Sequence, residues 1–208
     1  MTKKIKKGDL PKVHKSRSWQ SDLLGILVCV IMAVISVFVI HMVVFRSYSV
    51  TGPSMEPTFY TNDRIIVNRL PVTWAMLQGK QYIPSRGQVI VFENPLYKNG
   101  EEDKFIVKRV IGFPNERIVI NDSECLILIY NAEHESGFNP YDDLDIKPDC
   151  VSGNIDQVVD EESLFVVGDN RNGRHSLDSR SGLGLIPYSK IIGPVSMQIY
   201  PLDKIRFY

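Results

Sequence analysis

The sequence predicts a mainly β domain of roughly 160 residues with a small inserted subdomain, preceded by one N-terminal transmembrane helix. Three observations predict this class. Residues 23–45 form an apolar run without Asp, Glu, Lys or Arg. After residue 46, short runs of β-prone residues alternate with turn signals. An acidic stretch rich in Asn, Asp, Gly and Pro then interrupts the pattern, and we bound this insert at 121–162.

The apolar run is predicted to be a permanent membrane anchor. At about 1.5 Å per residue, a helix over 23–45 can cross a hydrocarbon core of about 30 Å. A cleaved secretory signal is the alternative, but its apolar core has only about 7–15 residues and ends at small residues, whereas this run ends at Phe45-Arg46. Seven of the first 20 residues are Lys or Arg, and such flanks stay in the cytoplasm. We therefore expect 1–22 inside the cell and 46–208 outside.

The outer domain shows strand signals rather than helical periodicity. Gly, Pro, Asn and Asp separate the β-prone runs. The predicted strands are 64–68, 88–92, 105–113, 116–120, 126–130, 163–167 and 191–199. The apolar segment 70–77, which contains Trp74 and Met76, is either a lip that dips into lipid or a buried turn of the core.

Charge and cysteine usage limit the possible functions. Residues 46–208 carry 17 basic and 22 acidic side chains, and an acidic domain is a poor candidate for nucleic-acid binding. Cys29 lies in the apolar run, whereas Cys125 and Cys150 lie in the outer domain, where they either form a disulfide or remain two thiols. The four histidines are scattered and no CxxC pair occurs, so we expect no metal site.

Ser54 is the first candidate for chemistry. It lies in the run Gly52–Thr58, close after the anchor. A serine hydroxyl needs a base to take its proton, and the outer domain offers His134, His175 or a lysine. Because a lysine has a pKa of about 10.4 in water, it can serve as the base only where burial favours the neutral amine.

Lys108 is the lysine with an apolar setting. It lies within the predicted strand 105–113, where alternation places it on one face with Ile106 and Val110, and Arg109 on the other. The two adjacent cations must therefore have separate roles. Spacing alone leaves two alternatives for Lys108, a buried base or a residue on an exposed strand face whose stem packs on its neighbours.

The segment 168–180 is dense in polar residues and follows a predicted strand. One interpretation is a solvated turn with surface ion pairs. The other is a loop that packs polar groups around a site. Composition alone leaves both open.

Four segments in this order resemble the ordered boxes of the bacterial type I signal peptidases, in which a membrane anchor precedes the first box. The segments are SMEPT at 54–58, RGQVIVF at 86–92, KRVIGFPNE at 108–116 and GDNR…SLDSR at 168–180. The resemblance implies an antiparallel-sheet catalytic domain at the outer face of the plasma membrane. It implies an endopeptidase that removes signal peptides from exported preproteins through an acyl-enzyme, without a cofactor and with the lipid bilayer as its other partner.

The resemblance also assigns roles to individual residues. Ser54 corresponds to the nucleophile, Lys108 to the general base, and Ser176 to the serine that orients the lysine amine. The residues that correspond to a supporting buried ionic network are Arg109, Asp169, Asp178 and Arg180. Substrates of the family carry small residues at positions −1 and −3 and bind as an extended strand. Met55 and Ile106 flank the proposed dyad and either line the two pockets or pack in the core.

The chain departs from the family pattern at two points. Gly52 stands where some members have a hydroxyl residue that contacts the oxyanion; the remaining candidate donors are the backbone N–H groups of Ser54 and Gly52, and the hydroxyl of Thr51. Four residues, 172–175, separate Arg171 from Ser176, where many members have two. Two further hypotheses are a self-cleaving regulator, which would require a DNA-binding module, and an inactive anchored binding protein.

Overall fold

The computed structural model describes residues 19–40, 44–98, 104–121, 123–142, 144, 153–171 and 176–208, and divides into two compact units, 1–39 and 40–208. In the first unit, helix α1 spans Trp19–Val39, and residues Asp22–Ile40 are long and apolar enough to cross a membrane. The predicted end of the span at Phe45 is wrong, because Phe45 begins strand β1 and pairs with Asn68. Hydropathy continues past the helix, so composition alone could not locate its end.

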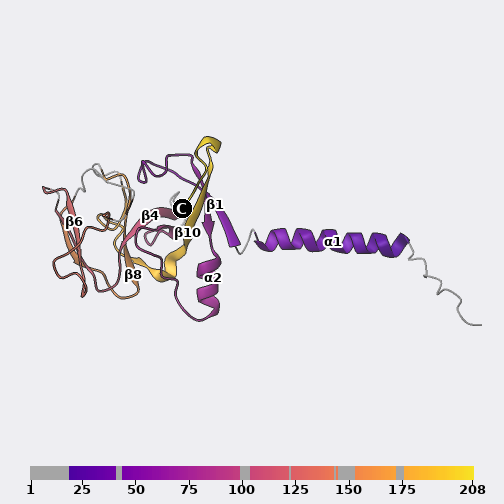
Figure 1. Cartoon of the computed structure of the whole chain (residues 1–208), viewed down its shortest axis with the longest axis horizontal. Coiled ribbons are helices and arrows are strands. Elements are labelled where there is room, and N and C mark those ends of the chain that lie inside the picture. Colours follow the sequence, from indigo (N-terminus) through magenta and orange to yellow (C-terminus); the bar gives the residue numbers. More distant parts are fainter. Residues whose placement is uncertain are drawn as a thin grey trace, which may run out of the picture. The chain divides into compact units, whose positions relative to one another are not determined.

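The second unit is built on a large antiparallel sheet, which confirms the predicted mainly β class (Figure 1). Within the part of the chain that the structure describes, its strand order is β1-β2-β10-β3-β4-β8-β9, with β11 on β10. The bounds are β1 Phe45–Ser49, β2 Arg64–Asn68, β3 Val89–Glu93, β4 Phe105–Gly112, β8 Ser163–Val167, β9 Ile186–Pro187, β10 Ile191–Tyr200 and β11 Arg206–Phe207.

A second sheet lies at the end of this unit away from β1 (Figure 1). It has the order β6-β5-β7, from β5 Arg117–Asn121, β6 Leu126–Tyr130 and β7 Ile155–Val158. This subdomain follows β4 directly and returns to the large sheet at β8. Cys125, in its β5–β6 turn, is disulfide-bonded, so the alternative of two free thiols is wrong for this residue; Cys150 lies outside the described residues.

Three hydrophobic clusters hold the unit together. One joins the small sheet to the ends of β4 and β8 through Ile111, Ile118 and Phe165. The other two lie on opposite faces of the large sheet, as the alternation of β3 shows, since Val89 and Val91 belong to one cluster and Ile90 and Phe92 to the other. Strand β4 lies between β3 and β8 in the sheet, and its two charged side chains, Lys108 and Arg109, are buried.

Most predicted strands are present, and the missed elements are short. The bounds of β2, β6 and β8 match the predicted ranges, those of β4 and β10 differ by one residue at one end, and β3 and β5 are each displaced by one residue. Local sequence carries no sufficient signal for β1, β7, β9 and β11, which have two to five residues. Helix α2 spans Leu70–Leu77 and has no buried residue, so the buried-turn alternative for 70–77 is wrong.

Candidate functional site

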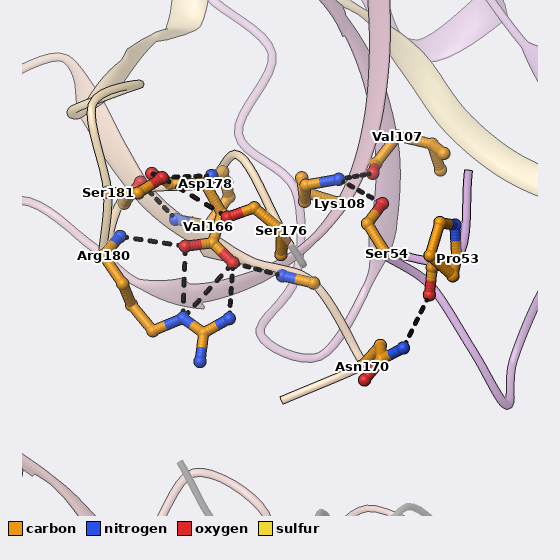
Figure 2. A network of polar contacts seen from close by, with 12 residues as sticks. Pro53, Ser54, Val107, Lys108, Val166, Asn170, Ser176, Asp178, Arg180 and Ser181 are labelled. Carbon is orange, nitrogen blue, oxygen red and sulfur yellow. Dashed lines mark hydrogen bonds and ion pairs between the residues drawn. The ribbon is translucent and has the colours of Figure 1, made fainter. Parts of the chain in front are cut away.

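Ser54 and Lys108 meet at the centre of the site. Ser54 lies in the loop that joins β1 to β2, and Lys108 lies in the middle of β4. The Lys108 Nζ donates a hydrogen bond to the Ser54 Oγ at 2.8 Å and a second to the Val107 carbonyl at 2.9 Å (Figure 2). Lys108 is only 3% exposed. The exposed-face alternative for this lysine is therefore wrong.

The Ser54 loop owes its course to Gly52. Its φ of +82° lies in the left-handed region, which residues with a Cβ rarely adopt, whereas no atom lies within 4 Å of the point that a Cβ would occupy. Backbone conformation rather than crowding therefore favours glycine here. This conformation gives a physical reason for the glycine that this chain carries at position 52.

Loop 168–171 is hydrogen-bonded to the Ser54 loop. The Asn170 backbone N–H donates to the Ser54 carbonyl, and its side-chain amide donates to the Pro53 carbonyl, both at 3.1 Å. A Cβ on Gly168 would lie 2.4 Å from the Ser54 carbonyl oxygen, so only glycine fits there. Sequence reasoning missed Asn170, because nothing along the chain links residue 170 to residue 53.

Ser176 is buried beside the same glycine. Its Oγ would lie 2.4 Å from a Cβ on Gly168, and Figure 2 shows the side chain between the Lys108 pair and Asp178. Ser176 helps to lower the pKa of Asp178, yet its hydroxyl forms no hydrogen bond of normal geometry with any described residue. The structure thus places Ser176 at the site, while the hydroxyl stays unpaired within the described part of the chain.

A buried ion pair joins β4 to the loop after β8. The Arg109 Nε and Nη2 donate to the two carboxylate oxygens of Asp169 at 2.7 and 2.5 Å, and its Nη1 donates to the Gly87 carbonyl at 2.6 Å. The Thr58 hydroxyl also donates to Asp169, at 2.5 Å. The pair therefore links the Ser54 loop, β4 and loop 168–171. Thr58 is a second contributor that sequence reasoning missed.

Asp178 and Arg180 form a second buried pair. The Arg180 Nη2 donates to the Asp178 Oδ2 at 2.8 Å, and the Gly168 N–H donates to the same oxygen at 2.9 Å (Figure 2). Burial acts to raise the pKa of Asp178, but the hydrogen bond and charge of Arg180 and the Gly168 N–H together hold this pKa below its usual value. Because Asp169 and Asp178 are both buried, the solvated-turn alternative for 168–180 is wrong.

Arg171 connects the site to the small sheet. Its guanidinium lies 3.8 Å from the ring centroid of Tyr141, which belongs to the core cluster of that sheet. Burial, followed by repulsion from Arg180, lowers the pKa of Arg171 to about 9. The subdomain thereby supports the loop that carries Asp169 and Asn170.

A cavity of about 340 Å³ opens beside the Ser54–Lys108 pair. Ile106 lines it, as expected for a substrate-contacting residue. Met55 does not; it is fully buried in the hydrophobic core, which is the alternative that the sequence had left open for it. The lining comes mainly from β1, the Ser54 loop and β4: Tyr48, Ser49, Val50, Thr51, Gly52, Pro53, Ser54, Ile65, Val91, Phe105, Ile106, Val107, Lys108 and Leu177.

Possible metal ligands and the histidines of the outer domain were the other candidates for chemistry. No group of three or more His, Cys, Asp or Glu residues that could hold a metal ion occurs among the described residues. His134 packs on Phe138 and contacts Asn131 in the small subdomain, so it is not part of the site, and His175 lies outside the described residues.

The chain matches the family described as signal peptidase, peptidase S26, over residues 23–200. The chain belongs to this family. It is 32% identical over 198 residues to signal peptidase I P of Bacillus subtilis subsp. natto, covering 92% of this chain and 97% of that protein. It is 31% identical over 202 residues to signal peptidase I of Bacillus amyloliquefaciens, covering 91% and 94%. These matches confirm the resemblance to bacterial type I signal peptidases.

Among solved structures, a signal peptidase I from Enterococcus faecalis V583 is similar at 23% identity and a TM-score of 0.36, covering 55% of this chain and 97% of that one.

Proposed function

We propose that the chain cleaves N-terminal signal peptides from exported preproteins, with Ser54 as nucleophile and Lys108 as general base. The observation that carries this proposal is the 2.8 Å hydrogen bond between the Ser54 Oγ and the Nζ of a lysine that is 3% exposed. Family membership supports the reaction class, and the curated relatives are signal peptidases I. The mechanism and the roles of the residues are our proposal.

Burial is the physical reason that a lysine can act as the base. Moving an ammonium out of water disfavours its charged form, so a buried amine gives up its proton more readily. The Lys108 Nζ lies 2.8 Å from the Ser54 Oγ, the oxygen whose proton it would take. The neutral amine would accept the Ser54 proton as the Oγ attacks the scissile carbonyl carbon.

The remaining steps follow from proton balance. The tetrahedral intermediate collapses as the Lys108 ammonium returns the proton to the leaving amine, and the mature protein departs with its new N-terminus. The signal peptide stays bound to Ser54 as an ester. The neutral Lys108 then takes a proton from water, the resulting attack breaks the ester, and the proton returns to Ser54.

The oxyanion donors are proposed to be backbone groups. Pro53 has no N–H, so the Ser54 N–H and the Gly52 N–H are the candidates. Thr51 lines the cavity, and its hydroxyl is the further candidate. One such donor typically contributes about 3 kcal/mol of transition-state stabilisation.

The cavity wall suits an extended substrate. β1 stands last in the order of the large sheet and contributes Tyr48 and Ser49 to the cavity, while β4 contributes Ile106. A signal peptide added between these elements would gain main-chain hydrogen bonds, and shallow pockets would select small side chains at −1 and −3. Ile106 is the proposed pocket residue that the geometry supports, and Met55 would act only by packing behind the loop.

The membrane arrangement is also a proposal. α1 would anchor the chain with 1–22 in the cytoplasm, and the catalytic domain would lie on the outer face of the plasma membrane, since the basic residues precede the span. A proteoliposome with a protease-accessible domain and a protected N-terminus would support this orientation, and the reverse pattern would contradict it.

The activity itself is tested with a radiolabelled preprotein and the purified full chain in detergent. We expect cleavage at one bond after a small residue, and none with Ser54→Ala. Thr61→Ala, on the same loop but outside the cavity lining, is the matched control and should cleave normally. Cleavage by the Ser54→Ala protein would remove Ser54 as nucleophile, and intact precursor with the unchanged chain would remove the proposed function.

A further inference from the structure

Helix α2 presents an apolar surface that the catalytic site does not use. Its sequence, LPVTWAML, contains no charged residue. Trp74, Met76 and Leu77 are 64%, 72% and 77% exposed, and Leu70 is 46% exposed. Figure 1 shows α2 at the periphery of the domain, where it contacts β10. Contiguous exposed apolar side chains of this size usually mark an interaction site.

The helix has a docked side and an outward side. Val72 packs against the hydrophobic cluster that contains Ile90 and Phe92. Leu70, Trp74 and Leu77 follow the i, i+4, i+7 spacing and share the opposite side. α2 therefore contacts the domain on the side of Val72 and presents a stripe of large apolar side chains on the other side.

The covalent chain keeps this stripe close to the candidate membrane span. The Arg69 N–H, immediately before α2, donates to the Val44 carbonyl at 2.7 Å. Val44 follows Ile40, the last residue of the candidate span, by four positions. Four residues reach at most about 15 Å, and the hydrogen bond adds 2.7 Å, so the Arg69 N–H lies within about 18 Å of Ile40, the last residue of the candidate span.

The chemistry of the stripe fits the interface between lipid headgroups and acyl chains. Tryptophan is enriched at this depth, where its ring is buried and its N–H stays hydrated. Arg69 precedes the helix and the exposed Lys80 follows it, so both flanks are cationic, as anionic headgroups require. We propose that α2 is an interfacial membrane helix that lies in the outer surface of the same bilayer that α1 crosses.

Such a helix would fix the catalytic loop at both ends. α1 precedes β1, α2 follows β2, and the Ser54 loop joins these two paired strands. With α2 on the bilayer, the β1–β2 hairpin is attached to the membrane before its first strand and after its second. The height of Ser54 above the lipid is then set by two attachments rather than by one flexible tether.

Fluorescence of Trp74 tests this directly, because the chain has only two tryptophans. The full-length Trp19→Phe protein is reconstituted into phosphatidylcholine–phosphatidylglycerol vesicles with and without acyl-brominated lipid. An interfacial helix places its apolar face about 5–10 Å into the headgroup and acyl boundary, so we expect bromolipid to quench Trp74 and acrylamide to quench it poorly.

The matched control moves the indole to the small sheet. In Trp19→Phe/Trp74→Phe/Val158→Trp, the new indole replaces a side chain that is 54% exposed, and we expect acrylamide but not bromolipid to quench it. Trp74 that is open to acrylamide and insensitive to bromolipid would overturn the proposal. Shielding from acrylamide without bromolipid quenching would also overturn it, in favour of a second copy or another protein as the occupant.

A second measurement separates this inference from the proposed catalytic function. Trp74→Gln/Leu77→Gln should slow the cleavage of a preprotein embedded in vesicles by about tenfold, as expected for a lost membrane contact worth roughly one decade in rate. The same protein should cleave a short soluble peptide in detergent at the unchanged rate. Equal loss in both assays would assign α2 a structural role, and no loss in either would contradict its contribution to positioning.

Discussion

The Ser54–Lys108 pair and the ionic network beside it are both buried, yet they are built differently. Arg109 is neutralised by Asp169, and Arg180 by Asp178. Lys108, the direct neighbour of Arg109 on β4, instead donates to a hydroxyl and a carbonyl, at the wall of a cavity. Adjacent positions on one strand thus hold a cation that is paired with a buried carboxylate and a buried amine that contacts the Ser54 hydroxyl.

The buried ion pairs and Lys108 are therefore expected to have different roles, the pairs in stabilising the fold and Lys108 in the reaction. A buried ion pair holds loops in register only while both partners remain, since removing one leaves an uncompensated charge. An amine that contacts the hydroxyl of a nucleophile is instead placed for proton transfer. The two regions should therefore respond in opposite ways to substitution, with activity lost in one and stability lost in the other.

The largest expected effect is on activity. Lys108→Met keeps an unbranched side chain in the buried position but removes the base, and we expect preprotein cleavage to fall by about 10⁴-fold or more, as for other nucleophile–base units. The melting temperature, measured by circular dichroism in detergent, should change by only a few degrees. Residual activity within about a hundredfold of the unchanged chain would show that another group accepts the proton.

The next effect is on stability. Arg109→Met leaves the Asp169 carboxylate buried without its guanidinium, and we expect a loss of about 3–5 kcal/mol in the free energy of unfolding. The double variant Arg109→Met/Asp169→Leu should lose less than the single one, because no lone charge remains. Denaturant titration measures both. A single variant as stable as the unchanged chain would contradict the supporting role of the pair.

Asp178 predicts how stability depends on pH. Its pKa is lowered in the folded state, so its contribution to stability is complete above the unfolded pKa of about 3.9 and is lost as the pH falls through the folded pKa. Asp178→Asn should therefore be destabilised at pH 7, and its difference from the unchanged chain should shrink below about pH 4. A difference that stays constant down to pH 2 would show that the ionised carboxylate is not responsible.

Ser176→Ala should have a smaller effect that falls mainly on activity. The hydroxyl forms no hydrogen bond of normal geometry with the described residues but helps to lower the pKa of Asp178, so its removal should lower the melting temperature only slightly. If the hydroxyl orients the Lys108 amine during the reaction, kcat should fall by about tenfold, the equivalent of one lost hydrogen bond, with KM unchanged. Unchanged kcat would show that the longer loop before Ser176 has removed it from this role.

The smallest effect is expected at an ion pair on the small sheet. Arg117 and Asp156 form a bidentate pair whose side chains are about half exposed. Solvent screens an exposed pair, which contributes little to stability, so Asp156→Asn should leave both activity and melting temperature nearly unchanged. A loss of stability as large as that expected for Arg109→Met would contradict the view that burial makes the Arg109–Asp169 pair more important for stability than the Arg117–Asp156 pair.

Sequence reasoning predicted the parts of the fold that rest on local pattern. Runs such as those of β4 and β8 carry consecutive β-branched and aromatic residues, so their position could be read from composition. β1 could not, because FRSYS has little intrinsic strand signal and is held in place by pairing with β2. α2 was missed as a helix because eight residues give too short a window for periodicity.

The residues of the site also fall into those that local sequence could predict and those that it could not. Alternation along β4 gave Lys108 and Arg109 different faces and hence different partners, as the structure has them. Asn170 and Thr58 were missed, because their bonds to Pro53 and Asp169 span more than a hundred residues and no local pattern encodes them. The burial of Met55 was equally inaccessible, since an apolar residue next to a nucleophile fits both a pocket and a core.

Trapping the acyl-enzyme tests the central claim most directly. The full chain is mixed with a signal-bearing peptide substrate, quenched in acid within one turnover, digested and analysed by mass spectrometry. We predict that the substrate's N-terminal part is attached to the peptide that contains Ser54, and that no adduct forms with Lys108→Met. An adduct on another residue, or an undiminished adduct on Ser54 without Lys108, would contradict the proposed Ser54–Lys108 dyad.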